Sequence, residues 1–178
     1  MRAFIAIEMP ENVKQEMIKI QKEVDRLGLI KGKFTEFENL HLTLKFLGEI
    51  SESELRAVKD KLEGIKFEPF ECELNELGVF SEEFIRIIWV GLKGENLFQI
   101  QKDVDKALQD IFPPENRFMA HVTLARPKYV EDKQVFINEL KKISLEKLKF
   151  QVNSVSLKES ELTKQGAKYS ELMMVRGR

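Results

Sequence analysis

Two histidines are the residues of this sequence whose type and spacing best fit a chemical role. They are the only histidines in the chain, and each begins a His-x-Thr-Leu motif, at 41–44 and at 121–124. Histidine has an ordinary pKa of about 6.5, so one ring can be protonated while the other is neutral near pH 7. Such a pair can protonate a departing oxygen and deprotonate an attacking nucleophile, which is the chemistry of phosphodiester cleavage.

The threonine of each motif is placed to assist its histidine. Residues i and i+2 of a strand point to the same side, so His41 shares a face with Thr43, and His121 with Thr123. An unmatched imidazole and hydroxyl are costly inside an apolar strand, which favours a function for both pairs. Across a cleft between two related strands, the hydroxyls could donate hydrogen bonds to phosphate oxygens.

The elements that must position these residues follow one order twice. Apolar residues spaced by three and four predict helices, and alternating apolar residues predict strands. The first half is predicted to hold strand 4–7, helix 13–27, strand 39–48, helix 51–65 and strand 70–74. The second half is predicted to hold strand 87–90, helix 97–111, strand 120–126, helix 136–143 and strand 150–155, followed by a last strand 169–175 beyond a turn at 165–166.

The repetition keeps a nearly constant offset. His41 and His121 lie 80 residues apart, as do the strand phenylalanines Phe70 and Phe150. This constancy indicates duplication of a β-α-β-α-β unit. We therefore expect one bilobal domain over residues 1–178, with half-repeats of about 1–81 and 82–178 and no linker between them.

The charge and hydrophobicity of the chain argue against two classes of protein, those that bind long nucleic acids and those that span a membrane. Lys and Arg number 29 against 30 Asp and Glu, a net charge of −1, so the chain lacks the basic excess of proteins that grip long nucleic acids. There is no apolar run of about 18 residues that would span a membrane. The opening strand meets Glu8 before a signal-like stretch develops, so we expect a cytoplasmic protein with no membrane partner.

Other catalytic classes have little support. Two histidines, the single Cys72 and scattered carboxylates show no spacing typical of metal ligands, so we expect no metal and no cofactor. A phosphate-binding G-x-x-x-x-G-K-[ST] loop is absent, which disfavours a nucleotide-driven ligase or kinase. Cys72 and Trp89 lie in apolar stretches and are expected in the core.

The residues around both histidines resemble a known family. Segments 41–48 (HLTLKFLG) and 121–126 (HVTLAR) look like the paired motifs of the two-histidine (2H) phosphoesterases, closest to the RNA 2',3'-cyclic phosphodiesterases, also called 2'-5' RNA ligases. The likeness spans essentially the whole chain. It implies opening of a cyclic 2',3'-phosphate to a 2'-phosphate, with His41 as proton donor to the 3'-oxygen and His121 as proton acceptor from water. It also implies weak, reversible 2'-5' joining of RNA ends.

The resemblance implies two further contacts with the nucleotide. Phe46 would stack on the base and Arg126 would bind phosphate, each five residues after its histidine. Strict strand alternation opposes this, because an odd offset points these side chains away from the histidine face. A β-bulge or the end of the strand must redirect them, and core packing is the alternative for Phe46. Lys45 falls on the histidine face by alternation, where we expect it to be solvated.

The predicted fold class is α+β, with pseudo-twofold symmetry, two antiparallel sheets flanking a central cleft, and helices outside. We expect a monomer that acts on RNA ends or oligonucleotides carrying a 2',3'-cyclic phosphate. Two alternatives stay open. One keeps the mechanism but takes a small cyclic nucleotide or an ADP-ribose cyclic phosphate. The other is a noncatalytic module that binds RNA ends.

Overall fold

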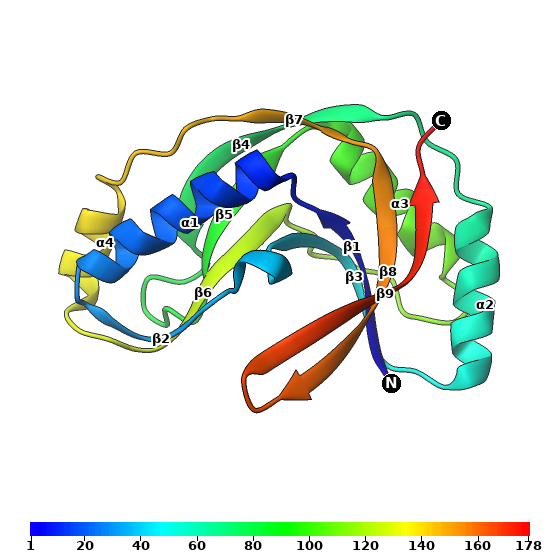
Figure 1. Cartoon of the computed structure of the whole chain (residues 1–178), viewed down its shortest axis with the longest axis horizontal. Helices are drawn as coiled ribbons and strands as arrows, with labels where there is room; N and C mark the ends of the chain where they lie inside the picture. The colour runs from blue at the N-terminus through cyan, green and yellow to red at the C-terminus, as the bar shows by residue number, and fades with distance from the viewer.

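The computed structural model describes residues 1–178 and shows four helices outside a curled antiparallel sheet of nine strands (Figure 1). The strands lie in the order β7-β4-β5-β6-β3-β1-β8-β9, and β2 also pairs with β6. The elements are β1 (Arg2–Glu8), α1 (Glu11–Arg26), β2 (Ile30–Phe34), the 3-10 helix η1 (Phe37–Asn39), β3 (His41–Glu49), α2 (Glu52–Glu63), β4 (Phe70–Val79), β5 (Ile88–Lys93), α3 (Glu95–Ala107), β6 (His121–Val130), α4 (Lys133–Leu140), β7 (Lys149–Val152), β8 (Ser154–Thr163) and β9 (Gly166–Arg176).

The predicted α+β class and antiparallel pairing are confirmed, but the two expected sheets are continuous. They join where β3 meets β6, through the register pair Leu42 opposite Val122. A short contact is sufficient because both strands are buried on the core side, where Leu42 and Val122 are fully covered. The two histidine strands are therefore direct neighbours at the middle of the sheet.

The helices form where the apolar spacing predicts them. In α1 the stripe Val13, Met17, Ile20 and Val24 is buried, while Gln15, Lys19 and Lys22 between them are exposed. Helix α2 begins at a capping box: the Glu54 backbone N–H donates to Ser51 Oγ at 3.2 Å, and the Ser51 N–H donates to the Glu54 carboxylate at 2.7 Å.

The two halves of the chain cover each other. Helix α1, from the first half, packs against β6, which carries the second histidine. Helix α3, from the second half, packs against β3, which carries the first. Each histidine strand is thus supported by a helix from the other half of the sequence.

Two strands differ from the prediction. Strand β2 was not predicted, because its sequence IKGKF is polar and mostly exposed. It pairs with β6 at a point where only glycine fits, since a Cβ on Gly32 would lie 2.4 Å from the Arg126 carbonyl oxygen. The predicted strand 150–155 is divided at Asn153 into β7 and β8, which pair with different neighbours. The predicted final hairpin is present with Thr163 opposite Gly166, but its turn is at 164–165 and not at 165–166, and β9 begins at Gly166, before the predicted strand 169–175.

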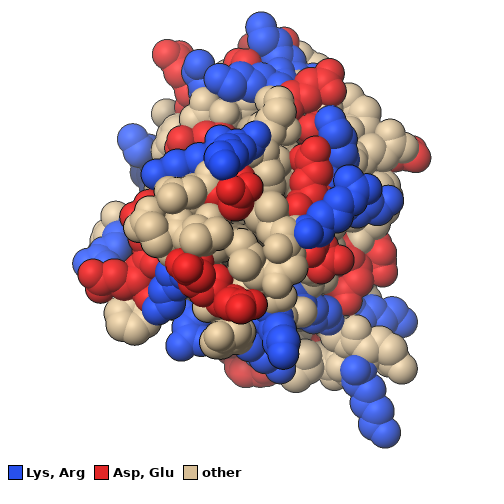
Figure 2. Space-filling view, turned by 90° about the vertical axis from the view of Figure 1, so that its left-hand side faces the viewer, with Lys and Arg blue, Asp and Glu red and all other residues tan.

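The charges on the surface and the residues in the core are distributed as the sequence predicts. Figure 2 shows basic and acidic side chains interspersed over one face of the molecule, as the net charge of −1 predicts. Cys72 and Trp89 are buried, as predicted. None of the four helices has both the length and the apolar character needed to cross a bilayer.

Candidate active site

A β-bulge in each histidine strand sets which side chains reach the same side. In β3, Ala6 lies opposite Thr43 and Ile5 opposite Lys45, so Leu44 is the extra residue. In β6, Trp89 lies opposite Thr123 and Ile88 opposite Ala125, so Leu124 is the extra residue. Both bulges come three residues after the histidine and shift the alternation by one position.

The bulges redirect Phe46 and Arg126. Both side chains are exposed, and both line one cleft together with His41, Thr43, His121 and Thr123. Phe46 is 72% exposed, so the alternative that it packs in the core is wrong. The structure therefore brings all six predicted site residues to a single cavity.

Pairing between the strands brings the two histidines close together. With Leu42 opposite Val122 in antiparallel register, His41 lies beside Thr123, and Thr43 beside His121. The two histidines are then diagonal neighbours, whose Cα atoms lie about 7–8 Å apart in such a pair. Both rings face the same cleft, so a group of atoms bound there can contact both.

Backbone carbonyls fix the orientation of both imidazoles in the same way. His41 Nδ1–H donates to the Asn39 carbonyl at 2.7 Å, and His121 Nδ1–H donates to the Met119 carbonyl at 2.8 Å. In each case the acceptor is two residues upstream. Nε2 is therefore the nitrogen that each ring presents to the cleft in its neutral form.

The two Nε2 atoms differ in their surroundings. His41 Nε2 accepts a hydrogen bond from the Thr43 hydroxyl at 2.9 Å. His121 Nε2 has no partner within the protein, and Thr123 Oγ1 makes no hydrogen bond with it. The lone pair of His121 is thus free to accept a proton from a bound molecule.

Burial and positive charge act on both histidines. Desolvation lowers the pKa of His41 to about 4, with smaller contributions in the same direction from Lys14, His121 and Arg126. Desolvation also lowers the pKa of His121, again with a contribution from Arg126. Both rings are therefore neutral at pH 7 in the free protein, contrary to the expectation that protonated and neutral forms coexist there.

The cleft has the size and charge of an anion-binding site. Its volume is about 690 Å³, within the range of roughly 300–1,000 Å³ typical of small-molecule sites. Three arginines line it, Arg2, Arg117 and Arg126, against the one carboxylate of Glu115. The local excess of positive charge contrasts with the nearly neutral chain as a whole and favours a ligand that carries phosphate.

Comparison with known proteins identifies the family. A family model described as "LigT like Phosphoesterase" matches residues 7–89 and again residues 90–169. The chain belongs to the LigT-like phosphoesterase family. Each match contains one of the two His-x-Thr motifs.

Two relatives of this LigT-like chain carry the name RNA 2',3'-cyclic phosphodiesterase. The protein from Methanocaldococcus jannaschii is 33% identical, with 95% of this chain and 96% of the relative covered. The protein from Methanothermobacter thermautotrophicus is 34% identical, with 98% of both chains covered. Among solved structures, a protein from Thermus thermophilus aligns over 99% of this chain and 97% of its own with a TM-score of 0.84 and 25% identity. Escherichia coli LigT shares the fold with a TM-score of 0.79 at 20% identity, over 99% of this chain and 96% of its own.

One lysine of this LigT-like phosphoesterase does not behave as expected. The bulge turns Lys45 away from solvent, where it is 5% exposed rather than solvated. Its ammonium pairs with the carboxylate of Asp105 on α3 and donates to the Pro113 carbonyl at 2.8 Å. The same carboxylate accepts the Glu115 N–H at 3.0 Å. Lys45 therefore anchors the segment that leads to Met119 and His121.

Sequence reasoning missed the aromatic and supporting residues around the histidines. Tyr169 and Phe4 contact His41, with ring centroids 5.3 and 5.0 Å from its ring, and Phe80 contacts His121 at 5.0 Å. Asn39 donates to the Ala167 carbonyl at 2.8 Å, which ties the support of His41 to the final hairpin. The three aromatic residues come from parts of the chain distant in sequence from the histidine that each contacts, so no local pattern identifies them.

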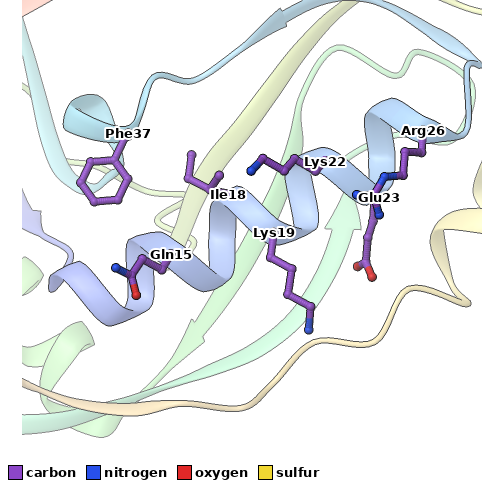
Figure 3. A pocket seen from close by; sticks show the side chains of 7 residues that line it. All are labelled: Gln15, Ile18, Lys19, Lys22, Glu23, Arg26 and Phe37. Atoms are coloured by element: carbon purple, nitrogen blue, oxygen red, sulfur yellow. The ribbon is translucent and has the colours of Figure 1, made fainter.

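A second hollow lies on the outer side of α1. It is lined by Lys19, Lys22, Arg26 and neighbouring side chains of the helix, with Phe37 of η1 at one end (Figure 3). It contains no histidine, and its cations project from one helix. Both histidines of this LigT-like phosphoesterase instead line the cleft between β3 and β6.

Proposed function

We propose that this protein hydrolyses 2',3'-cyclic phosphodiesters at RNA ends to 2'-phosphates, without a metal ion. The observation that carries the proposal is the pair of imidazoles, each oriented by a backbone carbonyl and each presenting Nε2 to one arginine-lined cleft. The names of the relatives from Methanocaldococcus jannaschii and Methanothermobacter thermautotrophicus support the same substrate. A complex of Escherichia coli LigT with 3'-AMP supports a nucleotide as ligand.

In the proposed reaction, His121 accepts a proton from water as the water oxygen attacks phosphorus. The P–O3' bond breaks, and His41 donates a proton to the departing 3'-oxygen, leaving the phosphate on the 2'-oxygen. The free Nε2 lone pair of His121 suits the acceptor role. His41 must be protonated in the complex although its pKa is about 4 in the free protein, and the phosphodiester anion beside the ring favours that charged form.

The remaining predicted residues hold the substrate. His41 Nε2, once protonated, no longer accepts from the Thr43 hydroxyl, so Thr43 and Thr123 both donate to nonbridging phosphate oxygens. Arg126 compensates the negative charge of the phosphate. Phe46 stacks on the base through its exposed ring. With a 5'-hydroxyl of a second RNA in place of water, the same geometry yields a 2'-5' linkage, so weak and reversible ligation is part of the proposal.

The test uses chelator-treated protein and an oligonucleotide that ends in a 2',3'-cyclic phosphate. We expect conversion to the 2'-phosphate isomer, and a loss of about 10²-fold or more in rate for His41→Ala and for His121→Ala. Unchanged circular dichroism of both variants excludes unfolding as the cause. Turnover that requires an added metal ion, or a 3'-phosphate product, would contradict the mechanism.

Parallel substrates separate the alternatives. A mononucleoside 2',3'-cyclic phosphate and an ADP-ribose cyclic phosphate are assayed beside the oligonucleotide. Faster turnover of either small substrate would assign the site to small cyclic phosphates. Tight binding of the oligonucleotide with no turnover of any substrate would identify a noncatalytic module that binds RNA ends.

A further inference from the structure

Each imidazole of the cleft has an aromatic ring standing edge-on beside it. Tyr169 of β9 meets His41 at 5.3 Å with an interplanar angle of 85°. Phe80, directly after β4, meets His121 at 5.0 Å with an angle of 87°. In the order of the strands, Phe80 comes from the β4–β5 side of the histidines and Tyr169 from the β8–β9 side. The two rings are therefore on opposite sides of the histidine pair.

Phe80 is fixed in place yet open to a ligand. Its ring packs on Trp89 at 5.6 Å, and Trp89 is itself confined, because a Cβ on Gly78 would lie 2.7 Å from the indole ring. Phe80 nevertheless remains 52% exposed and lines the cleft. A preset aromatic ring with an uncovered surface is the usual platform for a nucleobase.

Hydrolysis alone does not use this platform. A 2',3'-cyclic phosphate has one nucleoside, attached through the oxygens on the His41 side, and His121 needs only a water molecule beside it. A nucleoside next to His121 has a use when the attacking or departing group is the 5'-oxygen of a second nucleotide. Phe80 lies where it can contact the nucleoside that carries this 5'-oxygen, whereas an attacking water molecule has no base to stack on its ring.

We propose that Phe80 forms a second nucleoside subsite, which binds the nucleotide whose 5'-oxygen attacks or leaves at the His121 side of the cleft. This inference rests on the proposed function. In the ligation direction, the P–O5' bond forms as His121 takes the 5'-hydroxyl proton, and the P–O3' bond breaks as His41 protonates the 3'-oxygen. In the reverse direction, the 3'-hydroxyl attacks, His41 takes its proton, and His121 protonates the departing 5'-oxygen. The substrate class is therefore a 2'-5'-linked dinucleotide unit.

The loop offers a matched control. Phe84 lies four residues after Phe80 and is more exposed, at 66%, but it does not line the cleft. Lys133 of α4 stands 5.6 Å from the centre of its ring and donates to the Glu83 carbonyl, which holds this part of the loop on α4. Phe84→Ala therefore removes an equivalent aromatic side chain from the same loop without touching the proposed subsite.

The first measurement compares kcat/KM for two substrates, adenosine 2',3'-cyclic phosphate and 2'-5'-linked ApA. We expect Phe80→Ala to lower the ratio of dinucleotide cleavage to cyclic phosphate hydrolysis about tenfold, through KM, as loss of one base–aromatic stack predicts. Phe80→Tyr should restore the ratio, and Phe84→Ala should leave it unchanged. An equal fall for both substrates, or no fall for either, would overturn the subsite.

The second measurement does not depend on turnover. A 2'-5' ApA that lacks the 3'-hydroxyl cannot be cleaved, so its dissociation constant can be compared with that of adenosine 2'-monophosphate by calorimetry. Phe80→Ala should weaken binding of the dinucleotide about tenfold more than binding of the mononucleotide. Equal changes in the two dissociation constants would show that Phe80 forms no second subsite, even if the protein hydrolyses cyclic phosphates. Absence of that hydrolysis, with unequal changes, would instead contradict the proposed function and leave the subsite standing.

Discussion

The two histidines are oriented by equivalent backbone hydrogen bonds but have different surroundings. Each is held by the carbonyl two residues upstream, yet only His41 is also hydrogen-bonded by its threonine. Burial lowers the pKa of both rings, and lowers that of His41 to about 4. The sequence could locate these residues, because His-x-Thr spacing on a strand needs only local geometry. It could not predict the pKa shifts, which depend on what covers each ring.

The lowered pKa values lead to a prediction for the histidine resonances. In the free protein, we expect His41 to titrate near pH 4 and His121 below 6.5, so stability falls as the pH drops from about 6.5 towards 4, where the unfolded chain binds more protons than the folded one. Nuclear magnetic resonance can follow both rings, because the chain has only these two histidines. Adding adenosine 2'-monophosphate should raise the pKa of His41. A value of 6.5 in the free protein, or no change with the ligand, would contradict the electrostatic account.

At the scale of elements, the sequence was informative about helices and less so about strands. Spacing of apolar residues predicted α1 and α2 because one buried stripe specifies a helix. The bulges at Leu44 and Leu124 could be stated only as a condition for Phe46 and Arg126 to reach the cleft. Both bulged leucines are buried apolar residues, like others in the same strands. No change in residue type therefore marks the position where the alternation is broken. Phe80 and Tyr169 required the order of the strands, which no local pattern contains.

The buried ion pair between Lys45 and Asp105 can be tested by substitution. Lys45→Met leaves the Asp105 carboxylate without its partner and should cost about 3–5 kcal/mol in the free energy of unfolding, measured with urea. It should also lower kcat, because the freed segment ends at Met119, whose carbonyl orients His121. The control is Lys61→Met, whose pair with Asp110 is exposed and should cost less than about 1 kcal/mol.

Two outcomes would separate the parts of this prediction. Adding Asp105→Leu to Lys45→Met removes the unpaired carboxylate, so stability should partly return. The kcat should stay low, because the Asp105 contact with the Glu115 N–H is also lost. If stability returns and kcat returns with it, the anchor contributes to folding and not to the position of His121.

In the whole molecule, each half supplies the helix that packs on the histidine strand of the other half, so the folding of the two halves is coupled. We propose that the half-repeats of about 1–81 and 82–178 form one domain, since α1 packs on β6 and α3 on β3. Neither half can then bury its histidine strand alone, and the whole chain should unfold in one cooperative step. The β3–β6 contact that pairs the histidines would persist as long as the domain is folded.

The single tryptophan allows this to be measured. Trp89 lies on β5 beside the second histidine strand, whereas the far-ultraviolet circular dichroism reports helices from both halves. In urea, the two signals should change with the same midpoint and slope, and the isolated segments 1–81 and 82–178 should each lack a cooperative transition. Separate midpoints would show that the halves are stable on their own. The cleft between β3 and β6 would then be an interface that can open while each half stays folded, and activity should be lost before the second transition.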